Sequence, residues 1–133
     1  MMEYKDQLKF VYKYFPLSFQ NSLTAARAAQ AASLQNKFWE YHDILFQKQE
    51  EWGPVEDPLS KFKEYAQQLS LNLDQFEKDY KSPQVDQVVT AQHDEGVQNG
   101  VDSTPTFFVN NMRIDYKGYE TLKQAIDEAL NQK

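Results

Sequence analysis

The residues that could carry acid–base or metal chemistry are few and scattered. The chain has two histidines, His42 and His93. A tetrahedral metal site takes three or four ligands, and His93 has only the adjacent acids Asp94 and Glu95 beside it. Neighbouring acids are also ordinary on an exposed helix surface. We therefore expect His42 to pack among aromatic side chains, and we expect no bound metal at His93.

The carboxylates do not form a recognisable catalytic pair either. Four acidic residues flank a loop that contains Gly53: Glu50, Glu51, Glu56 and Asp57. This arrangement predicts a solvated rim of carboxylates rather than a catalytic acid and base. The sequence contains no Gly-rich phosphate loop, no His-Glu-x-x-His and no nucleophile elbow. It also contains no cysteine, so thiolate nucleophiles, disulfides and cysteine metal sites are excluded for this chain. We expect no cofactor.

The most informative stretch of the sequence is Asp102–Asn110. Pro105 stands directly before an apolar, β-favouring run, and proline is tolerated at the start of a strand because its missing N–H need not join the ladder. X-Pro bonds are cis in roughly 5% of folded cases. A cis Thr104–Pro105 bond would turn the backbone of Thr104 toward whatever docks there. The stretch is either a binding edge or only the beginning of a strand.

Length and composition predict one folded domain. The chain has 133 residues, 41% of them hydrophobic and 14% aromatic, and a net charge of −6. There is no basic patch to neutralise phosphates, which argues against nucleic acid as a partner. No apolar run of about 18 residues is present, so we expect no membrane span and no membrane partner. No apolar stretch follows Met1–Asp6, so we expect no signal peptide there, and the compartment is left open.

Periodicity predicts the elements that would hold these residues in place. Apolar residues alternate at one end of the chain, recur at helical spacing through the middle, and alternate again after Pro105. Two asparagines fit a two-residue hairpin turn because Asn tolerates positive φ. The expected elements are a strand at 8–15; helices from about 22 to 35, 37 to 49, 59 to 69, 73 onward and 83 to about 99; strands at 106–109 and 112–115; and a last helix through 122–130.

Three segments in this order carry a family resemblance. They are Phe10–Leu17, Lys37–Phe46 and Gly100–Asn110, and with the elements between them the likeness runs over nearly the whole chain. The sequence resembles the DsbA-like branch of the thioredoxin-fold thiol–disulfide oxidoreductases. The resemblance implies an α/β fold in one domain, 1–133, with a partial sheet of about three strands and an inserted helical region at 17–99.

The resemblance is incomplete in ways that bear on activity. Ser103 and Asn111 stand where the family commonly has glycine. The family's first strand and its Cys-x-x-Cys helix have no counterpart, so the domain is expected to be incomplete at its N-terminus. The resemblance implies a cis-proline substrate-binding loop at Thr104 and Pro105, with a protein or peptide as substrate. It carries no catalytic residue onto this chain. We expect a redox-inactive member of a family that is often exported.

Other interpretations remain open at this stage. The chain could be a non-catalytic binding module or scaffold that uses the groove beside Thr104–Pro105. It could also be an unrelated helical protein with a small hairpin, in which that bond would be trans; a glutathione-transferase-like domain fits the element order less well. An open sheet edge recruits other chains, so we also expect a homodimer or a strand-swapped assembly.

Overall fold

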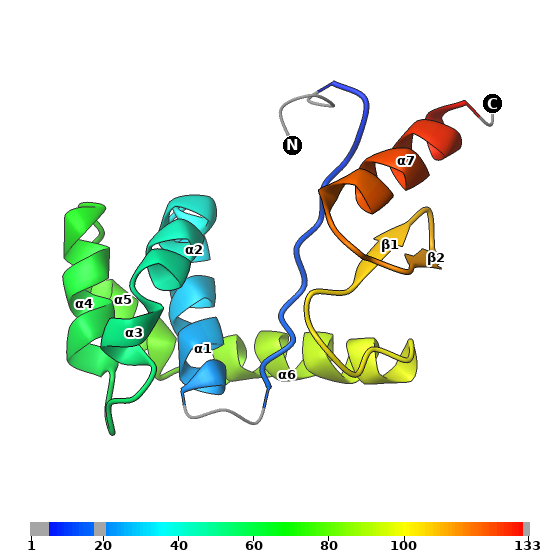
Figure 1. Cartoon of the computed structure of the whole chain (residues 1–133). Helices are drawn as coiled ribbons and strands as arrows, with labels where there is room; N and C mark the ends of the chain where they lie inside the picture. Colours follow the sequence, from blue (N-terminus) through cyan, green and yellow to red (C-terminus); the bar gives the residue numbers. More distant parts are fainter. Residues whose placement is uncertain (1–5, 18–20, 132–133) are drawn as a thin grey trace. The chain divides into compact units, whose positions relative to one another are not determined.

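The computed structural model describes residues 6–17 and 21–131 of the chain, which form two compact units (Figure 1). One unit runs from Lys13 to Asn99 and is helical. The other combines residues up to Tyr12 with those from Gly100 onward, and it holds the sheet. The elements are α1 (Ser22–Ser33), α2 (Phe38–Gln47), α3 (Gln49–Trp52), α4 (Leu59–Gln68), α5 (Leu73–Tyr80), α6 (Pro83–Gln98), β1 (Phe107–Val109), β2 (Met112–Ile114) and α7 (Tyr119–Leu130).

The helical unit is built around α1, which packs against α2, α4, α5 and α6. This helix is rich in alanine, the residue with the highest helix propensity. Ala28, Ala31 and Ala32 are fully buried. Because their side chains are a single methyl group, the neighbouring helices approach α1 closely. The alanine-rich segment is therefore the centre of the unit.

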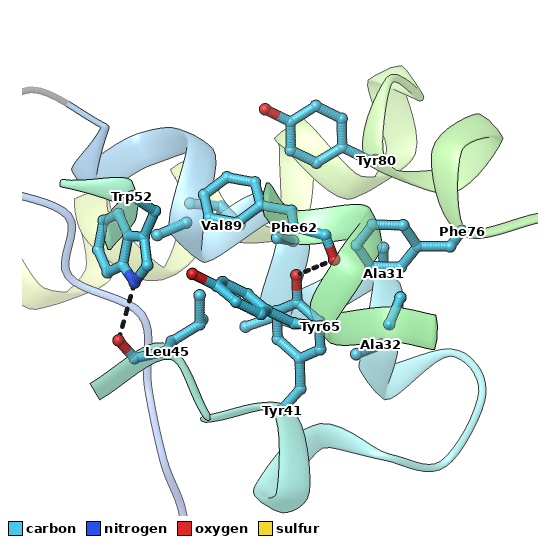
Figure 2. Packing of buried hydrophobic residues seen from close by; sticks show 14 of the residues in the cluster. Ala31, Ala32, Tyr41, Leu45, Trp52, Phe62, Tyr65, Phe76, Tyr80 and Val89 are labelled. Carbon is cyan, nitrogen blue, oxygen red and sulfur yellow. Dashed lines mark hydrogen bonds between the residues drawn. The ribbon is translucent and has the colours of Figure 1, made fainter. Parts of the chain in front are cut away.

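Aromatic side chains fill the space around α1 (Figure 2). Tyr41, Phe62, Tyr65 and Phe76 have almost no exposed surface. The Tyr41 hydroxyl donates to the Phe62 carbonyl at 2.9 Å, so its polar end is satisfied inside the core. Trp52 is also buried, and its indole N–H donates to the carbonyl of Leu45 at 2.8 Å. The burial of these large aromatic side chains is the main apolar contribution to the stability of this unit.

The ends of the helices use their capping residues in different ways. Ser82 caps α6 by accepting from the Val85 amide, and Pro83 is the first helical residue, as predicted. Asn72 caps α5. Asn21 precedes α1 in a left-handed conformation and makes no side-chain cap. Its side-chain amide instead donates to the carbonyls of Trp52, Gly53 and Val55 at 3.0, 3.1 and 2.6 Å, which ties the start of α1 to the loop after α3.

The sheet unit is a two-stranded antiparallel hairpin with α7 against one face. Val109 pairs with Met112 across the Asn110–Asn111 turn. Both turn residues have positive φ, 50° and 70°, which a type I′ hairpin requires. Phe107 and Val109 pack against Leu122 and Ile126 of α7. The hairpin and its register were thus predictable from the two asparagines and the alternation around them.

The predicted strand at 8–15 is wrong: in the part of the chain that the structure describes, the sheet has two strands and not three. Leu8 contributes to the small core beside α7, and Tyr14 is buried in the helical unit, but Phe10 and Val11 are half exposed. A strand needs a neighbour for its backbone hydrogen bonds, and no described strand lies beside this segment. The apolar alternation at 8–15 reflects the β propensity of its residues and not a strand. The segment instead connects the two units along the chain.

Candidate functional site

The loop before β1 is held by Arg113, which projects from β2. Its guanidinium donates to the carbonyl of Gly100 at 2.7 Å and lies 3.5 Å from the carboxylate of Asp102. Gly100 has φ of 81°, a left-handed value that favours glycine. The Thr106 hydroxyl donates to the Ser103 carbonyl at 2.7 Å and closes the turn around the proline. The loop is therefore fastened to β2 at its start and closed on itself around the proline.

Thr104 and Pro105 lie exposed at the tip of this loop, and the peptide bond between them is cis. An open hollow of about 470 Å³ adjoins the loop. Its lining combines polar and apolar groups from the loop, from β2 and from the residues after it. The lining residues are Ser103, Pro105, Thr106, Arg113, Ile114, Asp115 and Tyr116.

The chemical groups at this hollow suit binding rather than bond-making. Arg113 offers a guanidinium, Asp115 a carboxylate and Tyr116 a phenol beside the ring of Phe107, with 4.7 Å between ring centroids. No thiol exists in the chain. Sequence reasoning missed Arg113. The two-residue turn fixes its pairing with Phe108, but nothing local to Arg113 in the sequence indicates that its side chain reaches the Gly100 carbonyl.

The two histidines lie in the helical unit. His42 has its ring 4.8 to 5.8 Å from the rings of Phe38, Trp39 and Phe46, as expected for a packing residue. His93 stacks on Phe15 with 4.6 Å between ring centroids. Among the described residues, no group of three or more His, Asp and Glu side chains is placed to hold a metal ion.

The start of the loop predicted at 50–57 is helical, because Glu50 and Glu51 lie on α3 and Glu56 and Asp57 in the loop after it. The carboxylates of this region have structural contacts. Glu51 accepts from the Tyr65 hydroxyl at 3.0 Å and pairs with Lys48, and Asp57 accepts from the Leu59 amide at 3.1 Å. These contacts tie the loop to α4. Within residues 6–17 and 21–131, no helix is both long enough and apolar enough to cross a membrane.

Comparison with known proteins gives two kinds of relative. The chain is 35% identical over 114 residues to a Na⁺/H⁺ antiporter NhaA 1 from Mycolicibacterium vanbaalenii, covering 81% of this chain and 17% of that protein. It is 37% identical over 109 residues to NhaA 1 from Salinispora arenicola, covering 80% and 16%. The chain thus spans about a sixth of the length of these relatives.

A solved structure shares the fold. It is a thioredoxin-like oxidoreductase from Silicibacter pomeroyi DSS-3, which superposes with a TM-score of 0.71 at 22% identity, over 92% of this chain and 68% of that one. The family model described as thioredoxin matches residues 2–128, nearly the entire sequence. The α/β fold expected from the sequence is therefore thioredoxin-like, and the chain belongs to the thioredoxin family.

Proposed function

We propose that this chain is a thiol-free thioredoxin-family module that binds an extended polypeptide beside the Thr104–Pro105 loop. Thiol–disulfide exchange needs an attacking thiolate, and the chain has no cysteine to supply one. The observation that carries the proposal is the hollow next to the exposed loop, lined by Pro105, Arg113 and Tyr116. The Tyr116 ring offers an apolar contact, while Arg113 and Asp115 can orient a peptide by charge.

A binding measurement tests this function. A library of extended peptides is screened by fluorescence anisotropy, and the tightest binder is titrated onto Pro105→Ala. Because the ring of Pro105 lines the hollow, we expect the dissociation constant to rise about tenfold, which corresponds to roughly 1.4 kcal/mol. Pro54→Ala, an exposed proline in the loop after α3 of the helical unit, is the matched control and should bind normally. Equal loss in both variants, or no peptide bound by the wild-type chain, counts against the proposal.

The redox part of the proposal has its own assay. Insulin reduction by dithiothreitol should proceed at the same rate with and without the chain, because no thiol is present to turn over. Acceleration that scales with the concentration of the chain would overturn it.

A second candidate function rests on the relatives. The region of similarity is a minor part of proteins named Na⁺/H⁺ antiporters, which favours a module that associates with a cation antiporter. Titration of the chain onto an antiporter of that kind in proteoliposomes tests this: saturable binding supports the candidate, and none counts against it.

A further inference from the structure

Helix α2 has two apolar faces, and the core uses one of them. Tyr41 and Leu45 are buried inside the helical unit (Figure 2). A helix at a protein surface normally has a single apolar stripe, which is turned toward the core. Trp39 and Phe46 lie on another side of the same helix, and they are 46% and 62% exposed. Large apolar side chains that are grouped at a surface mark interaction sites.

The exposed rings belong to one compact group, the α2 outer patch, which consists of Trp39, His42, Asp43 and Phe46. Residues three or four positions apart are neighbours on a helix surface, so His42 and Asp43 each lie beside both exposed rings. The His42 ring is 5.4 Å from the ring of Trp39 and 4.8 Å from that of Phe46, measured between centroids. These contacts account for His42, but they leave the two outer rings largely open to solvent.

The acid in this patch is Asp43. Its side chain is 69% exposed, and its Oδ1 lies 3.2 Å from Nδ1 of His42. A carboxylate accepts through both oxygens, so Asp43 can take a further donor. The lysines at the two ends of α2 form ion pairs with other acids, Lys37 with Glu40 and Lys48 with Glu51.

The charge of the surroundings favours a cationic occupant. The chain carries a net charge of −6, and most of that excess lies in the helical unit, Lys13–Asn99. A surface that combines exposed aromatic rings with a carboxylate attracts cations and repels the anionic headgroups of lipids. It also repels a second copy of the same acidic patch.

Arginine is the side chain whose chemistry matches both parts of the patch. Its guanidinium is planar, stacks on aromatic faces and donates several N–H groups to a carboxylate, whereas a lysine ammonium is a compact, strongly hydrated charge. We propose that the α2 outer patch binds an arginine side chain of a partner polypeptide, packed against the exposed rings and hydrogen-bonded to Asp43. The patch lies on α2, so this inference does not rest on peptide binding at the Thr104–Pro105 loop.

A binding titration tests the proposal. The probe is a fluorescein-labelled peptide of alternating arginine and leucine, followed by anisotropy. Asp43→Asn removes the charge and Phe46→Ala removes a ring, and we expect each to raise the dissociation constant about threefold. The same peptide with lysine in place of arginine should bind about threefold more weakly to the wild-type chain.

Two matched variants separate this site from a general effect of charge or apolar surface. Glu64→Gln removes an acid of similar exposure, 60%, from α4, and Leu34→Ala removes an apolar side chain that is 55% exposed after α1. Both should bind the arginine peptide as the wild-type chain does. Asp43→Asn keeps the size of an exposed side chain, so the test does not depend on the folding of Phe46→Ala.

Several results would overturn the proposal. They are no binding by the wild-type chain, equal loss in Asp43→Asn and Glu64→Gln, and equal affinity for the arginine and lysine peptides. A loss in Pro105→Ala as large as that in Asp43→Asn would place the probe at the loop instead. Binding of phosphatidylglycerol vesicles, or self-association in light scattering, that Phe46→Ala abolishes would assign the patch to a lipid surface or a second copy.

Discussion

Tyr41 is a fully buried phenol whose ionisation is suppressed by its surroundings. Burial is the main cause, and the neighbouring Tyr65 and Tyr80 add to it, so the pKa of Tyr41 lies well above the usual 10.0. Burial and the Glu51 carboxylate raise the pKa of Tyr65 as well. When the chain unfolds, both phenols return to their ordinary pKa. The two buried phenols therefore contribute fully to the free energy of unfolding below pH 10, and that free energy falls as the pH rises above 10.

This gives a prediction at the residue scale. Tyr41→Phe removes the hydrogen bond to the Phe62 carbonyl, which we expect to cost about 1 kcal/mol at pH 7. Above pH 10 the variant should lose stability less steeply than the wild-type chain, since it has one fewer phenol to ionise on unfolding. Urea unfolding followed by circular dichroism between pH 7 and 11 checks both. Parallel pH profiles for the two proteins would contradict the assignment.

At the scale of elements, the close approach of helices to α1 depends on its alanines. Ala31 is completely buried. Ala31→Leu inserts three carbon atoms where the helices have no space, and such overpacking costs roughly 1–3 kcal/mol. Ala91→Leu makes the same change at an exposed position of α6 and should stay within about 0.5 kcal/mol of the wild-type chain. Thermal unfolding distinguishes the two, and equal destabilisation would show that α1 tolerates larger residues.

The elements also show what local sequence can and cannot predict. Ser82–Pro83 and Asn110–Asn111 act through their own backbone geometry, so the start of α6 and the hairpin register followed from the sequence. The segment at 8–15 has equally clear alternation, but a strand depends on a neighbour that local pattern does not reveal. Arg113 was missed for a related reason: its role comes from the loop carbonyl it reaches, thirteen residues away.

At the scale of the whole molecule, the two units differ greatly in how much they bury. The large cluster around α1 contains many fully buried side chains, whereas the cluster beside α7 rests on Leu122 and Ile126. Local opening free energies follow the amount of buried apolar contact. We therefore expect the amides of α7 and the hairpin to exchange with solvent faster than those of α1 and α6.

Hydrogen exchange detected by mass spectrometry checks this expectation. Exchange of α1 and α7 amides at the same rate would indicate that the chain opens as one cooperative unit. The resemblance implied a helical region at 17–99, but the difference in buried apolar surface between the two units could not be predicted from the sequence, where both have ordinary amphipathic helices.

The side-chain amide of Asn21 has one further consequence, which concerns chemical ageing. Its N–H groups hold three loop carbonyls. Hydrolysis of that amide would place a carboxylate opposite the three carbonyl oxygens. All of these groups are hydrogen-bond acceptors, because an ionised Asp has no hydrogen to donate. A single spontaneous change of about one dalton would then convert three attractive contacts into repulsive ones and release the loop after α3 from the start of α1. On storage, we expect molecules in which Asn21 has been hydrolysed, and its contacts to the loop lost, to accumulate with time.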